Sequence, residues 1–143
     1  MKLKLKASIR TAAEEWREKY DYDDYAGGFD EDFHKGFPRV KLNGKWGFVD
    51  ATGKEVVPLK YDYAGFFQEQ EGLAPVYLNN KRGFVDVTGK EVVPLKYDRC
   101  SQSSFDKGLA EVRLYGVKWG FVDVTGKEYW NMTKEEARKQ MKS

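Results

Sequence analysis

The chain has 143 residues, of which 41% are hydrophobic and 15% aromatic, so it is long enough and apolar enough to form one folded domain. Its 25 basic and 23 acidic residues are interspersed, and the net charge of +2 gives no pattern typical of a nucleic-acid-binding protein. One cysteine and one histidine exclude an intrachain disulfide and a cysteine-rich metal site. No apolar run is long enough to span a membrane, and no apolar segment follows the basic N-terminus. We therefore expect a cytoplasmic protein with no nucleic-acid partner.

The N-terminal segment has the spacing of an amphipathic helix. Apolar side chains recur at helical intervals along one stripe, namely Ile9, Ala12, Ala13, Trp16 and Tyr20. Ser8 is a suitable N-cap, so we predict a helix over residues 7–20 that caps the fold. The acidic stretch 21–32 lacks the central glycine and the final glutamate of a calcium-binding loop, and we expect it to be a solvated loop.

A tandem repeat occupies most of the remaining chain. Residues 45–61 read KWGFVDATGKEVVPLKY, and residues 81–97 are identical to them at 15 of 17 positions. Residues 118–128 match residues 81–91 at 10 of 11 positions, so the repeat length is 36 to 37 residues. The units begin near an Asp-Tyr or Asp-Arg pair, which divides the chain into three predicted repeats: 24–61, 62–97 and 98–130.

Each unit has the pattern of short strands joined by tight turns. Asn43-Gly44 predicts a type I′ hairpin turn, because both residues tolerate positive φ. Asp50 to Gly53 predicts a second turn, in which the aspartate accepts hydrogen bonds from the backbone. Pro58 lacks an N–H group, so its strand is expected at a sheet edge. We predict a three-stranded antiparallel meander in each unit.

The C-terminal segment predicts a second helix over residues 133–142. Thr133 and Glu136 have the spacing of a capping box, and Met132 and Ala137 are placed to form a hydrophobic staple. The predicted fold is mainly β, with three tandem repeats of about 36 residues between two capping helices, all in a single repeat domain over residues 1–143.

The pattern Lys-Trp-Gly-Phe-Val-Asp-x-Thr-Gly-Lys-Glu-Val-Val-Pro-x-x-Tyr-Asp resembles the WG-repeat (KWG, WG β-repeat) family of bacterial proteins. The resemblance covers residues 24–130, and Arg82 departs from it where the family has tryptophan. It implies a β-rich repeat scaffold, and members of the family are generally interpreted as binding or interaction modules. It does not imply an enzymatic activity.

Few residues have the arrangement of a catalytic or cofactor site. Gly83 to Lys90 resembles a phosphate loop, but five residues separate its glycines where four are needed. Asp50, Asp86 and Asp123 could line a cation site, but we expect each to stabilise its own turn. His34 and Cys100 have no orienting partner in the sequence. We predict a protein that is not an enzyme, with no cofactor and no bound metal.

The recurring aromatic residues are the candidate binding residues. The positions at unit spacing are Trp46, Tyr61, Arg82, Tyr97 and Trp119. They are expected to form a repeated core, and the alternative is a ladder of rings exposed on one face that binds a partner. We predict a module that binds a protein partner. The alternatives are a glycan or cell-envelope binding module that uses exposed Trp and Tyr, and a hydrolase with two carboxylates brought together by folding.

Overall fold

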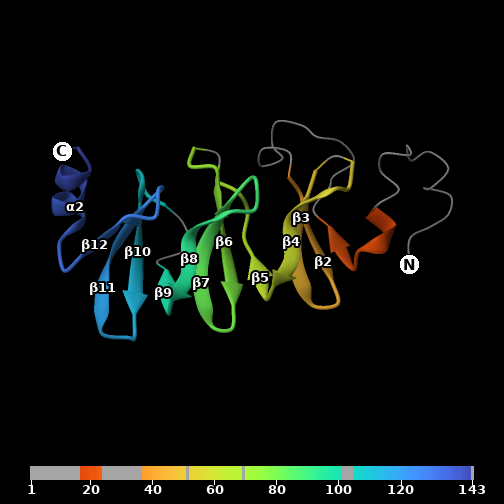
Figure 1. The fold of residues 1–143 in the computed structure, drawn as a ribbon, viewed down its shortest axis with the longest axis horizontal. Helices are drawn as coiled ribbons and strands as arrows, with labels where there is room; N and C mark the ends of the chain where they lie inside the picture. The colour runs from red at the N-terminus through yellow and green to blue at the C-terminus, as the bar shows by residue number, and fades with distance from the viewer. Residues whose placement is uncertain (1–16, 24–36, 51, 69, 101–104, 143) are drawn as a thin grey trace.

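The computed structural model describes residues 17–23, 37–50, 52–68, 70–100 and 105–142. These residues form three four-stranded antiparallel sheets in a row, followed by one helix (Figure 1). The first sheet contains β1 (Tyr22–Asp23), β2 (Arg39–Leu42), β3 (Lys45–Val49) and β4 (Glu55–Tyr61). The second contains β5 (Tyr63–Ala64), β6 (Leu73–Leu78), β7 (Lys81–Asp86) and β8 (Glu91–Tyr97). The third contains β9 (Arg99–Cys100), β10 (Leu109–Leu114), β11 (Lys118–Asp123) and β12 (Glu128–Trp130).

The mainly β fold predicted from the sequence is confirmed, but each sheet has one strand more than expected. The extra strand is the two-residue β1, β5 or β9 at the start of the sheet. In the second sheet, Asp62 N donates to Tyr77 O at 2.8 Å and Gly65 N donates to Pro75 O at 2.9 Å, on either side of β5. This pairing joins residues distant in sequence, so two residues with no alternating pattern gave no local signal for a strand.

The turns follow the sequence prediction. Asn43 and Gly44 have φ of 53° and 80°, as a type I′ turn requires, and Asn79 and Asn80 take the same conformation in the second sheet. In the following turn, the Asp50 carboxylate accepts hydrogen bonds from Thr52 N at 2.8 Å, Thr52 Oγ1 at 2.6 Å and Lys54 N at 3.1 Å. The same bonds recur around Asp86 and Asp123.

A glycine in the middle strand lets the edge strand cross closely over it. Pro58 is on β4, which is an edge strand as predicted, and β8 and β12 hold the same place in their sheets. A Cβ atom on Gly83 would lie only 2.4 Å from the Val93 carbonyl oxygen, and Gly47 and Gly120 are equally confined. The β3–β4 and β7–β8 registers shift at this point, which marks a bulge. The glycine of each Trp-Gly or Arg-Gly pair is therefore required by packing.

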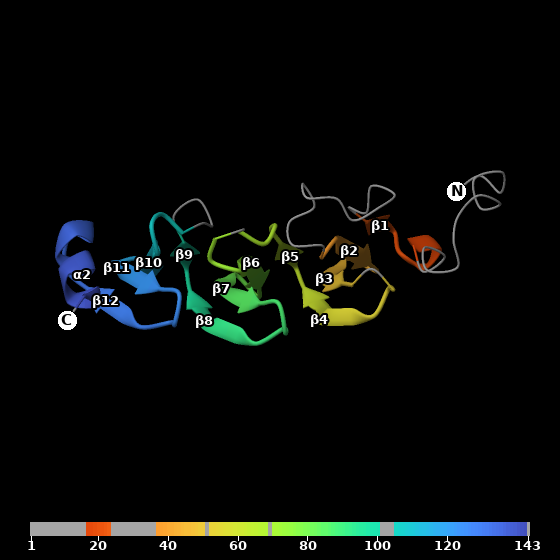
Figure 2. The ribbon, with the colours of Figure 1, turned by 90° about the horizontal axis from the view of Figure 1, so that it is seen from above.

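The sheets stack face to face along the row. Seen from above, β4, β8 and β12 lie along one long side, and β2, β6 and β10 lie behind them (Figure 2). The core lies between successive sheets. The first interface packs Phe48, Val57 and Tyr61 of the first sheet against Ala74, Val76 and Val85 of the second. The second interface packs Phe84, Val93 and Tyr97 of the second sheet against Ala110, Val112 and Val122 of the third.

Helix α2 (Lys134–Met141) covers the last sheet, as predicted (Figure 1). Thr133 and Glu136 form the expected capping box, with Glu136 N donating to Thr133 Oγ1 at 3.1 Å. The buried Ala137 packs with Leu109, Phe121 and Tyr129, and Met132 joins this cluster. Burial and the nearby Asp123 carboxylate raise the pKa of Tyr129 to about 12. Within the described residues, no helix is long and apolar enough to cross a membrane.

At the other end, only part of the predicted N-terminal segment can be placed. Tyr20 packs with Val40 and Val49, and Asp21 Oδ2 accepts a hydrogen bond from Asn43 N at 2.9 Å. Asp62 bonds Asn79 N in the same way, so Asp21 is the structural counterpart of Asp62. Several sequence predictions fall outside the described residues. They are the helix over residues 7–20, apart from its last residues, the repeat start at Asp24, the acidic stretch from residue 24, and the role of His34.

A candidate aromatic and cationic binding surface

The residues predicted as a partner-binding set separate into two groups. Tyr61 and Tyr97 are fully buried. The side chains of Trp46, Arg82 and Trp119 reach the surface, and Trp119 is 41% exposed. The expectation of a shared repeated core is therefore confirmed for the two tyrosines, confirmed in part for Trp46, which packs against the first interface, and wrong for Trp119. Only the surface group is placed to touch a partner.

The buried tyrosines link one sheet to the next. The Tyr61 hydroxyl donates to Glu91 Oε2 at 2.8 Å, and the Tyr97 hydroxyl donates to Glu128 Oε2. Lys60 and Lys96 pair with the same glutamates at 3.4 and 2.8 Å. Burial and the bonded Glu91 carboxylate raise the pKa of Tyr61, so this hydroxyl stays protonated. These glutamates therefore hold the sheets together.

A continuous line of rings and cations crosses the rim between the first and second sheets. The Lys41 ammonium lies 5.5 Å from the centre of the Trp46 ring, which is 5.5 Å from the Tyr63 ring. Tyr63 is 5.4 Å from the Tyr77 ring, over which the Arg82 guanidinium lies at 4.3 Å. We call Lys41, Trp46, Tyr63, Tyr77 and Arg82 the aromatic–cation row.

Arg39 fixes one side of this row. Its side chain is only 7% exposed, and its guanidinium lies 3.9 Å from the Phe66 ring centre and 5.0 Å from that of Trp46. Arg39 Nη1 donates to Ala64 O at 2.8 Å and to the Tyr63 hydroxyl at 3.2 Å. Tyr63 and Phe66 are nevertheless 41% and 43% exposed. The rings are thus held in place on one side and open to solvent on the other.

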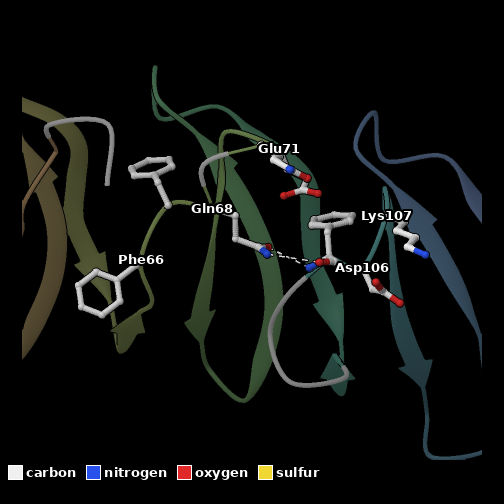
Figure 3. A pocket seen from close by; sticks show the side chains of 8 residues that line it. Phe66, Gln68, Glu71, Asp106 and Lys107 are labelled. Carbon is white, nitrogen blue, oxygen red and sulfur yellow. Dashed lines mark hydrogen bonds between the residues drawn. The ribbon is translucent and has the colours of Figure 1, made fainter. Parts of the chain in front are cut away.

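A hollow of ≈ 530 Å³ lies beside Phe66, between the loops that precede β6 and β10 (Figure 3). Gln68 reaches across it, with Nε2 donating to Phe105 O at 3.3 Å and Oε1 accepting from Phe105 N at 2.9 Å. Asp106 on its rim pairs with Lys134 of α2 at 3.0 Å, which lowers the Asp106 pKa. Phe66 contacts Arg39 beside the row and also lines the hollow, so the hollow continues the surface of the row.

The carboxylates have structural partners. Asp50, Asp86 and Asp123 stabilise their turns, as predicted, and the hydrogen bonds they accept outweigh burial and lower their pKa values. Asp62 and Asp98 bind Lys45 and Lys81 across the hairpins. In the described part of the chain, no three side chains of His, Cys, Asp or Glu gather as metal ligands would.

Sequence reasoning missed Arg39, Tyr63, Phe66 and Tyr77. Tyr63 and Tyr77 lie outside the nearly identical blocks 45–61 and 81–97, so the repeat pattern did not single them out. The sequence did contain one signal for Tyr77. Arg82 replaces a tryptophan in the same unit in which Tyr77 replaces Lys41, so the cationic and the aromatic residue have exchanged positions.

Comparison with protein families gives one match. Residues 46–81 and residues 83–117 each match the WG containing repeat. Each match starts within a middle strand, β3 or β7, and ends in the first hairpin of the next sheet. The repeat unit of the family therefore begins partway through one sheet and ends partway through the next. The comparisons find no matching curated protein and no matching solved structure.

Proposed function

We propose that this chain, which belongs to the WG-repeat family through its two tandem matches, is a non-catalytic module that binds a protein partner. The observation that carries the proposal is the exposure of Tyr63 and Phe66 beside Trp46 and Arg39. Tyr, Trp and Arg are the residues most often responsible for binding energy at protein interfaces.

The geometry favours binding at low entropic cost. Immobilising a flexible side chain on binding costs about 0.5–1.5 kcal/mol, and a side chain already held in place avoids most of this cost. Tyr63 contacts the Trp46 and Tyr77 rings and accepts a hydrogen bond from Arg39. Its ring therefore has little freedom left to lose when a partner covers it.

The roles of the carboxylates support a non-catalytic module. A general acid or base must be free to contact a substrate. Glu91 and Glu128 accept bonds from buried tyrosines and pair with lysines, and Asp123 accepts bonds from Thr125 and the Tyr129 hydroxyl. These groups join sheets or close turns, which accounts for their presence without a reaction.

The test is an affinity capture from native cell lysate with three forms of the full chain. The forms are the wild type, the surface variant Tyr63→Ser/Phe66→Ser, and the control variant Val124→Ser. The control removes an exposed apolar side chain from the turn that follows β11, at the end of the third sheet away from the row. We expect one stoichiometric protein with the wild type and the control, and its loss with the surface variant. Circular dichroism establishes that all three forms fold.

Two results would contradict the proposal. One is capture that is equal in all three forms, since the row would then not be the binding surface. The other is the absence of any enriched protein. A glycan array probed with the wild type and the surface variant then tests the alternative, in which the exposed rings stack on sugars.

A further inference from the structure

We propose that the aromatic–cation row binds an acidic, extended segment of the partner protein. This inference rests on the proposed function and names the partner's chemistry at the same surface. It follows from three features: the pair of a cationic and an aromatic residue that recurs in each sheet, the ion pairing of the cations, and the distance between the stacked sheets that the row crosses.

In each sheet a cationic and an aromatic residue are cross-strand partners beside the first hairpin turn, and in the first two sheets the cation also lies over the ring. The cross-strand pairs are Lys41–Trp46, Tyr77–Arg82 and Arg113–Trp119. In the second sheet the two types have exchanged strands, and the Arg82 guanidinium lies 4.3 Å from the Tyr77 ring centre. Arg82 therefore keeps the chemistry of the pair, although it departs from the Trp-Gly pattern.

Among the described residues, the cations of these pairs have no acidic partner. In the part of the chain that the structure describes, no carboxylate lies within ion-pair distance of Lys41, Arg82 or Arg113. Nearby Lys45 and Lys81, in contrast, pair with Asp62 and Asp98 at 2.7 and 3.0 Å. Carboxylates of a partner would complement the three remaining cations, and rings beside them would cover the partner's apolar atoms.

The stacking of the sheets sets the spacing of the partner's carboxylates. Sheets packed face to face are about 10 Å apart, and an extended chain advances about 3.3 Å per residue. A segment lying along the row therefore passes one sheet in about three residues. Glu111 is two residues from Arg113 on the same face of β10, which weakens the third position. Lys41 and Arg82 lie at opposite ends of the row, which is built of four successive contacts of 4.3–5.5 Å. Side chains on one face of an extended chain are an even number of residues apart, so we expect the two carboxylates that reach Lys41 and Arg82 to be about four or six residues apart.

The experiment selects short random peptides displayed on phage against the immobilised full chain. Peptides enriched by the wild type should contain two Asp or Glu residues at an even spacing of about four or six residues. The best peptide is then synthesised and its Kd measured by fluorescence anisotropy. We expect Lys41→Glu/Arg82→Glu to weaken binding at least about tenfold, and Arg82→Lys to weaken it by less than about threefold. Lys90→Glu, in the turn at the far end of the second sheet, is the matched control and should leave Kd unchanged.

The outcomes separate this proposal from the one on which it rests. Enriched peptides that are neutral or basic, yet lost with Tyr63→Ser/Phe66→Ser, would retain the binding surface and overturn the acidic partner. A Kd unaffected by charge reversal would do the same. Heparin or single-stranded DNA bound more tightly than any peptide would assign the row to another polyanion. If no enriched peptide depends on Tyr63 and Phe66, the binding surface itself is wrong.

Discussion

Replacing Gly83 by alanine tests why a glycine follows the tryptophan or arginine in every unit. A Cβ atom at this position would lie 2.4 Å from the Val93 carbonyl oxygen and 2.9 Å from the Pro94 carbonyl group. Backbone atoms cannot turn aside as a flexible side chain can, so β8 would have to move. Val93 and Tyr97 are fully buried on either side of the contact, and Tyr97 is bonded to the third sheet. The displacement would therefore disturb the second interface as well.

We expect Gly83→Ala to lower the free energy of unfolding by about 3 kcal/mol, at the upper end of the usual cost of overpacking. In a protein of this size, that loss lowers Tm by about 6–12 °C. Urea unfolding followed by tryptophan fluorescence measures the change. Gly44→Asn is the control, because nothing lies within 4 Å of a Cβ there and Asn80 holds a φ of 64° at the same place in the second sheet. A loss below about 0.5 kcal/mol in Gly83→Ala would refute the close-approach argument, since changes that small are ordinary at surface sites.

Three further changes test the links between elements. Tyr97→Phe removes the hydroxyl that donates to Glu128 and should cost about 2 kcal/mol in urea unfolding, whereas Tyr115→Phe, at a 76% exposed ring, should cost nothing measurable. Thr133→Ala removes the cap of α2 and should cost about 1 kcal/mol, and an unchanged unfolding curve would mean that α2 adds no stability. Burial raises the pKa of Asp123, but bonds from Thr125 and Tyr129 outweigh it, so the folded pKa lies below 3.8. Such a group stabilises the fold at pH values above its unfolded pKa, and this stabilisation is lost as the pH falls through the folded pKa. The free energy of unfolding should therefore drop between about pH 5 and pH 3, and it should drop less steeply in Asp123→Asn. Equal stability at the two pH values would contradict this assignment.

The local elements of this fold were predictable because their signals are local. Asn43-Gly44 specifies its turn through two residues that accept positive φ, and Thr133 with Glu136 specifies a helix start through two reciprocal bonds. The short strand β5 was not predictable, because its two residues are in strand conformation only through pairing with β6. The face-to-face stacking of the sheets was not predictable for a similar reason, since a period of 36 residues suits a linear row or a partial barrel.

The residues of the proposed binding surface were harder to predict than the fold. Tyr61 and Trp46 recur at the same unit spacing and face each other across β3 and β4, yet Tyr61 is fully buried and Trp46 reaches the rim. Periodicity shows which positions are equivalent, but the exposure of each one depends on the sheet that stacks against it. Phe66 illustrates the same limit, because its place above Arg39 of the first sheet depends on the loop between β5 and β6 of the second sheet.

Comparison of the three sheets with one another separates framework from surface. Several positions that are identical in every unit have structural roles: the glycine allows the edge strand to cross, the phenylalanine and valine are buried, and the aspartate closes the turn. Among the positions that differ between units, two lie near the rim beside the row. Arg39 is replaced by Pro75 and Glu111 in the later sheets, and Trp46 is replaced by Arg82 in the second. If the row binds one partner, as proposed, each sheet meets a different part of that partner. Differences between the sheets at Arg39 and Trp46 are then expected, because equivalent positions would contact different groups.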